Sequence, residues 1–112
     1  MSLARALSRM PREPGLEETL RDVLVLFRRH PREQLSADDV VMRAGCPREH
    51  VTVLLPALVQ GFVLTDDEQS GMYRFDGDVC LGYEIDAFVR RIDSLRAFQR
   101  NNVAKFRDRY GS

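Results

Sequence analysis

The spacing of hydrophobic residues in the middle of the chain predicts two consecutive helices. The first covers residues 37–44, with Ser36 as its expected N-cap and Gly45 as the left-handed residue that ends it. The second covers residues 47–60. A very short strand at Gln34 and Leu35 comes before this pair. The core face of the second helix consists of Val51, Leu54, Leu55 and Leu58.

A hairpin of two short strands is predicted directly after these helices. Residues 62–64 and 72–75 are rich in β-branched and aromatic side chains, and residues 65–71 between them are polar. Three consecutive acidic residues lie in the expected hairpin tip, namely Asp66, Asp67 and Glu68.

The segment before the short strand predicts one strong helix and a separate arm. Residues 16–30 place hydrophobic side chains on one helical face, and Pro31 stops the helix. Residues 1–15 form the arm, in which Leu3, Leu7 and Met10 fall at helical spacing. We expect a docked or frayed terminus. The alternative is a basic arm that touches phosphate or a partner.

The last part of the chain predicts one long helix over residues 82–109, starting as early as Asp78. Such a helix is roughly 40 Å long, whereas the radius of gyration of a domain this size is only ~13 Å. We therefore expect a second copy to cover part of its apolar stripe. The alternative is that the helix bends back onto the first helix and the arm. The expected dimer contacts are Ile85, Phe88, Ile92, Leu95 and Phe106.

These elements predict an α+β, mainly α fold in three parts. Residues 1–15 are the arm, residues 16–77 the helix-and-hairpin domain, and residues 78–112 the long helix. The 112 residues carry 17 basic and 17 acidic side chains, so the simplest argument for nucleic acid, a basic domain, is absent. The arginines of the long helix are expected to form a solvated face.

The order helix, turn, helix, two strands resembles the winged helix-turn-helix family of bacterial transcription regulators, including its MarR-like and PadR-like branches. The resemblance rests on the segment Leu35 to Val40, on Gly45, on the passage Gln60-Gly61-Phe62-Val63, and on Tyr73-Arg74-Phe75. It implies a winged helix-turn-helix with a long C-terminal dimerisation helix. It also implies a homodimeric protein that binds duplex DNA and regulates transcription. The two cysteines, Cys46 and Cys80, do not indicate a disulfide framework, so we expect a reducing cytoplasm.

By this resemblance, the helix from Pro47 is the recognition helix, whose first outward residues reach the major groove. Arg48 is then expected to pair with a guanine, with His50 beside it, and Thr52 to contact phosphate or a thymine methyl. Ser36 and Arg43 are the expected phosphate contacts.

The acidic hairpin tip favours a second hypothesis. Residues 62–82 carry five acidic side chains and one arginine, for a net charge of −4. An acidic tip repels a phosphate backbone. The alternative function is therefore a winged-helix protein-interaction module without direct DNA binding, in which Asp66, Asp67 and Glu68 dock on a protein partner.

Motifs for other chemistry are missing from the sequence. No phosphate loop, GxSxG or HExxH motif is present, so we expect no enzyme and no cofactor. His30 and His50 lack metal-ligand spacing, and we expect no metal site. Cys46 precedes a helix, where a lowered pKa would suit a redox switch; the alternative, which we favour, is a small buried turn residue. No run reaches the ~18 apolar residues of a membrane span.

Overall fold

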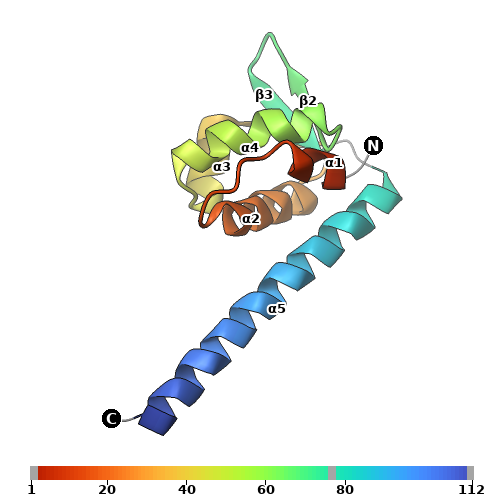
Figure 1. Cartoon of the computed structure of the whole chain (residues 1–112). Helices are drawn as coiled ribbons and strands as arrows, with labels where there is room; N and C mark the ends of the chain where they lie inside the picture. Colours follow the sequence, from red (N-terminus) through yellow and green to blue (C-terminus); the bar gives the residue numbers. More distant parts are fainter. Residues whose placement is uncertain (1–2, 76–77, 111–112) are drawn as a thin grey trace.

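The computed structural model describes residues 3–75 and 78–110, with side chains through residue 98. The fold is α+β and mainly helical, as the hydrophobic pattern predicts, with a small antiparallel sheet and a long C-terminal helix (Figure 1). The elements are α1 (Leu3–Ser8), α2 (Leu16–Arg29), β1 (Leu35–Ser36), α3 (Ala37–Ala44), α4 (Arg48–Gln60), β2 (Leu64–Asp67), β3 (Met72–Phe75) and α5 (Val79–Tyr110).

Helices α2, α3 and α4 surround the centre of the core. The predicted apolar face of α2 is buried, with Leu20, Val23, Leu24 and Phe27 all fully inaccessible. Gly45 ends α3 in the left-handed conformation at φ 66°, as expected. Pro47 is the N-cap of α4 with extended backbone, so the helix begins at Arg48, one residue later than the sequence predicts.

The hairpin starts later than the sequence predicts, at Leu64 instead of Phe62. Phe62 has φ 63°, and the N–H of Val63 donates to the carbonyl of Leu58 at 2.9 Å. This is the hydrogen-bond pattern that closes a helix with a left-handed residue. Phe62 and Val63 therefore terminate α4 and are not part of the strand.

The three strands form one antiparallel sheet in the order β1-β3-β2. Tyr73 in the central strand pairs with Leu35 on one side and with Asp66 on the other. The hairpin tip projects away from the helices (Figure 1). The acidic residues therefore lie at the far end of the wing-like hairpin.

The arm is docked on the rest of the chain. Leu3 and Ala6 of α1 are buried in the core that also contains side chains of α2, α4 and α5. A Cβ at Gly61 would lie only 2.6 Å from Cβ of Ala6, so α1 approaches the end of α4 as closely as a glycine allows. Arg9 also donates to Oε1 of Gln60 at 3.2 Å.

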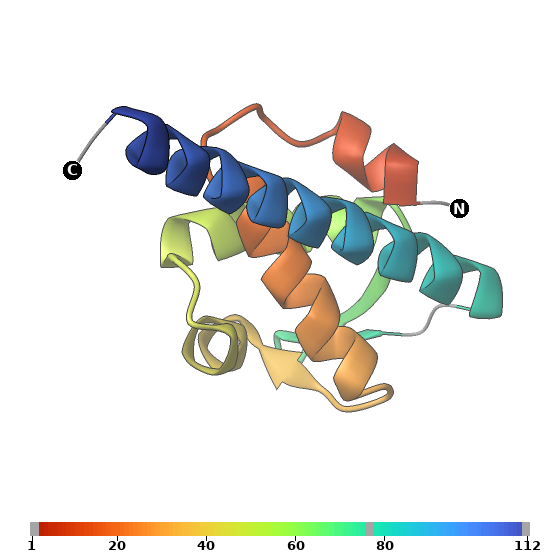
Figure 2. The ribbon, with the colours of Figure 1, turned by 90° about the horizontal axis from the view of Figure 1, so that it is seen from below.

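The long helix α5 crosses α2, while α1 lies beside its first half (Figure 2). Asp78 begins it by accepting a hydrogen bond from the N–H of Leu81 at 2.8 Å. Ion pairs join it to α2, among them Arg28–Asp86 at 3.0 Å and Arg96–Glu18 at 3.4 Å. The second half of α5 extends away from the other elements, giving the chain a length of 57 Å (Figure 1).

The expected set of dimer contacts needs correction. Ile85, Phe88 and Ile92 are 1%, 5% and 3% exposed, because the same chain covers them with α1 and α2. The helix achieves this while staying one continuous helix, so its first half packs on its own domain. Leu95 is 50% exposed. Phe106 lies outside the described side chains.

Candidate nucleic-acid interface

The start of α3 is held by a reciprocal pair of hydrogen bonds. The N–H of Asp39 donates to Oγ of Ser36 at 3.1 Å, and the N–H of Ser36 donates to Oδ2 of Asp39 at 3.1 Å. The hydrogen bond from the Ser36 amide is the main cause that lowers the pKa of Asp39. Ser36 is thus the N-cap of α3, and its hydroxyl oxygen is used within the chain.

The two predicted DNA-binding arginines are already paired with acidic residues. Arg48, at the start of α4, makes an ion pair with Asp38 of α3. Arg43, at the end of α3, pairs with Glu33 at 3.0 Å. All four side chains are 41–70% exposed. Such exposed pairs contribute about 0–1 kcal/mol, so either arginine can exchange its carboxylate for another anion at little cost.

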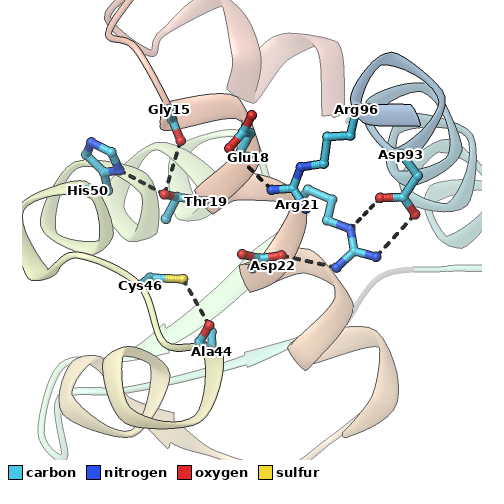
Figure 3. Close-up of polar contacts among 10 residues, drawn as sticks. All are labelled: Gly15, Glu18, Thr19, Arg21, Asp22, Ala44, Cys46, His50, Asp93 and Arg96. Carbon is cyan, nitrogen blue, oxygen red and sulfur yellow. Dashed lines mark hydrogen bonds and ion pairs between the residues drawn. The ribbon is translucent and has the colours of Figure 1, made fainter. Parts of the chain in front are cut away.

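His50 is half-buried, and its ring is turned toward α2 and not toward the outer face of α4. Its Nδ1 lies 2.8 Å from Oγ1 of Thr19 in α2 (Figure 3). The Thr19 hydroxyl also donates to the carbonyl of Gly15 at 3.2 Å, so both contacts are satisfied when Nδ1 carries the ring hydrogen. His50 therefore joins α4 to the start of α2.

Thr52 remains on the exposed face of α4, one turn after Arg48. Its Oγ1 donates to the carbonyl of Arg48 at 2.9 Å. Together with Glu49, these residues form the exposed first turns of α4. The structure thus leaves Arg48 and Thr52 exposed on the outer face of α4, whereas His50 is half-buried against α2.

The hairpin tip carries its acidic side chains in two different roles. Asp67 accepts a hydrogen bond from the N–H of Gln69 at 3.0 Å. This hydrogen bond is the main reason why the pKa of Asp67 is lowered. Asp67 therefore shapes the turn, whereas Asp66 and Glu68 are exposed without such a bond in the described part of the chain. A shallow groove of about 490 Å³ runs beside them, bordered by Gln34, Met72 and Arg74.

Cys46 is a buried turn residue, which is the alternative that the sequence favoured over a redox switch. It is 7% exposed, and its Sγ contacts the carbonyl of Ala44 at 3.6 Å (Figure 3). Burial, followed by the negative charge of Asp22, raises the pKa of its thiol. The lowered pKa that a redox switch requires is therefore absent at this position. Cys80 is exposed.

The acidic partners of Arg43 and Arg48 were the residues that the sequence pattern missed. Glu33 and Asp38 each lie ten positions before their arginine. Residues ten positions apart are not neighbours on one helix. Each pair meets because the chain turns before α3 and again between α3 and α4. The equal numbers of acidic and basic residues were the one sequence signal that pointed to such pairing.

Within the described residues, no group of three or more His, Cys, Asp or Glu side chains lies close enough to hold a metal ion. Across the same residues, none of the helices combines the length and the apolar character needed to cross a membrane. Comparisons with protein-family models, curated proteins and solved structures found no match.

Proposed function

We propose that this chain is a winged helix-turn-helix protein that acts as a homodimeric, DNA-binding transcription regulator in the bacterial cytoplasm. The supporting observation is the order β1-α3-α4-β2-β3 with strand order β1-β3-β2, which leaves the first turns of α4 exposed next to a projecting hairpin. In a winged helix, α4 enters the major groove and the hairpin is the wing.

For the arginines on this face to bind DNA, each must exchange its acidic partner in the protein for a group of the nucleic acid. Arg48 leaves Asp38 and pairs with a guanine or a phosphate, and Arg43 likewise exchanges Glu33 for a phosphate. Both carboxylates then remain exposed to water, so their desolvation costs little. The acidic wing tip repels the duplex and is expected to stay off its backbone.

The test is a gel shift with pooled genomic fragments at a series of salt concentrations. We expect binding that weakens steeply with salt, and Arg48→Gln should reduce the slope of log K against log salt by about one. Arg91→Gln is the matched control, because Arg91 is an exposed arginine of α5 that lies beside α1 and not beside Arg43 or Arg48. Absence of any shift at about 50 mM salt would refute the DNA reading.

A second candidate function is a winged-helix protein-interaction module without DNA binding. It is favoured by the exposed carboxylates of Asp66 and Glu68 beside the shallow groove at the hairpin tip. The pairing of Arg43 and Arg48 with carboxylates also favours it. The variant Asp66→Lys, Glu68→Lys separates the two functions while keeping Asp67, which shapes the turn. A DNA-binding wing should gain affinity for DNA, and a protein-docking wing should gain none.

A further inference from the structure

A shallow groove lies where the end of α2 meets the first half of α5 (Figure 2). We name it the α2–α5 groove; it has a volume of about 670 Å³. Val25, Ile85 and Val89 give it an apolar lining, and the ring of Tyr83, which is 68% exposed, also borders it. Val25 and Val89 are only half-buried, so a partner that covers them removes apolar surface from water.

One arginine of this groove is held in place from two sides. Nη2 of Arg28 donates to Oδ2 of Asp86 at 3.0 Å, and Nε donates to Oδ1 at 3.4 Å. The guanidinium also lies against the backbone of Gly82, because a Cβ there would be 3.1 Å from both Cζ and Nη2 of Arg28. Glycine is less favourable than alanine inside a helix, and this close contact gives Gly82 its packing role. Arg28 and Asp86 thus form a fixed pair without net charge.

Two further arginines make the groove positively charged. Arg29 and Arg90 line it and are both exposed. Among the residues with described side chains, neither of them belongs to an ion pair. The bond from Arg28 lowers the pKa of Asp86, and the charge of Arg90 lowers it further, so Arg90 lies close to this pair. Three arginines and one aspartate give the groove a net charge of +2, in a chain whose total is zero.

The position of Arg90 distinguishes this cluster from an ordinary helix end. Arg28 and Arg29 suit the last turn of α2, where the helix dipole favours positive charge. Arg90 lies well inside α5, so no helix end accounts for it. Arginine and tyrosine side chains around an apolar centre are the composition that protein interfaces favour. The groove therefore combines the charge and the apolar surface that suit a negatively charged partner.

We propose that the α2–α5 groove binds an acidic peptide segment of a partner protein. Carboxylates of the segment pair with Arg29 and Arg90, and its apolar side chains cover Val25, Val89 and the ring of Tyr83. The apolar lining favours a peptide over a phosphate backbone, which has no apolar side chain to place there. The start of α4 lies at the opposite end of the domain from the first half of α5 (Figures 1 and 2). The proposal therefore depends neither on DNA binding nor on a dimer.

The first test measures peptide binding by fluorescence anisotropy. The probe is a short fluorescein-labelled peptide of glutamate and leucine only, with leucine at helical spacing. Arg29→Gln with Arg90→Gln should raise its dissociation constant about tenfold, as expected for the loss of two exposed ion pairs. Arg12→Gln with Arg91→Gln is the matched control, because both are exposed arginines outside the groove. The proposal is overturned if the parent protein does not bind the probe, or if both double variants bind it equally well.

The second test separates a peptide site from a site for any anion. A polyglutamate peptide of the same charge should bind more weakly than the probe, and duplex DNA should not displace the probe. Tyr83→Ala should weaken binding of the probe several-fold. Met42→Ala is its control, since Met42 is 81% exposed on α3 outside the groove. Equal affinity for polyglutamate, or displacement of the probe by DNA, would show that the groove takes anions in general and would rule out the peptide site.

The third test asks whether a second copy of this chain occupies the groove. Sedimentation at micromolar concentration should give the same mass for the parent protein and for Arg29→Gln with Arg90→Gln. A lower mass for this variant alone would assign the groove to a second copy and refute a separate partner. A gel shift that finds no DNA binding counts against the proposed function only and leaves the peptide site standing.

Discussion

Arg21 of α2 donates two hydrogen bonds to Asp93 of α5, from Nε to Oδ1 at 3.0 Å and from Nη2 to Oδ2 at 3.1 Å (Figure 3). The two side chains are 26% and 45% exposed, so water weakens the pair. We expect a coupling of about 0.5–1 kcal/mol between Arg21→Gln and Asp93→Asn in the free energy of unfolding. Chemical denaturation of both single variants and the double variant measures it. A coupling of zero would mean that this ion pair contributes nothing to holding α5 on α2.

Ser36→Ala should lower the free energy of unfolding by about 1 kcal/mol, because it removes the cap of α3. The cap also sets a pH dependence. The pKa of Asp39 is below 3.8 in the folded protein, so its contribution is present above pH 3.8 and is lost as the pH falls through the lower, folded value. In Ser36→Ala the pKa of Asp39 should rise, and this acid-induced loss should shrink. NMR titration of Asp39, with Ser36→Thr as a capping control, checks both effects.

His50→Ala should destabilise the fold without altering any preference among DNA sequences. It leaves the hydroxyl of Thr19, a residue only 6% exposed, without one of its two partners, at a cost of about 1–2 kcal/mol. Thr52→Ala is the comparison, since Thr52 is exposed and bonds only within its own helix turn. Thermal denaturation and binding to a set of DNA sequences distinguish the two. A change in base preference without loss of stability would show instead that His50 contacts DNA.

The two thiols should differ sharply in reactivity. Cys80 is exposed and should react with a thiol reagent in the folded protein, whereas Cys46 should react only after unfolding, because it is buried and its pKa is raised. Mass spectrometry after brief labelling, with and without denaturant, counts the modified cysteines. Rapid labelling of Cys46 in the folded chain would show that the turn before α4 opens.

Local chemistry made the helix boundaries in the middle of the chain predictable. Ser36 and Gly45 mark the ends of α3 through contacts within a few residues, and both were correct. Phe62 was misplaced because a glycine beside it appeared to end α4, whereas the left-handed position belongs to Phe62 itself. The role of a residue in such a turn depends on where the following strand must begin, which short-range patterns do not contain.

Contacts between distant segments decided the candidate site and were not predictable. The ion pairs of Arg43 and Arg48, and the inward position of His50, depend on how α2, α3 and α4 pack. The burial of Ile85, Phe88 and Ile92 likewise follows from the crossing of α5 over α2. An apolar stripe on a helix shows that something covers it, and only the packing shows whether that cover is the same chain.

The close approach of Ala6 to Gly61 limits which part of α4 can enter a DNA groove. Because α1 lies against the last turn of α4, the helix can enter a groove only with its first turns, around Arg48 and Thr52. Two helical turns span about 11 Å, the length of about three base pairs. A recognition site that short recurs by chance throughout any genome. In the proposed dimer, the distance between the two copies would then carry more information than the bases that each copy touches.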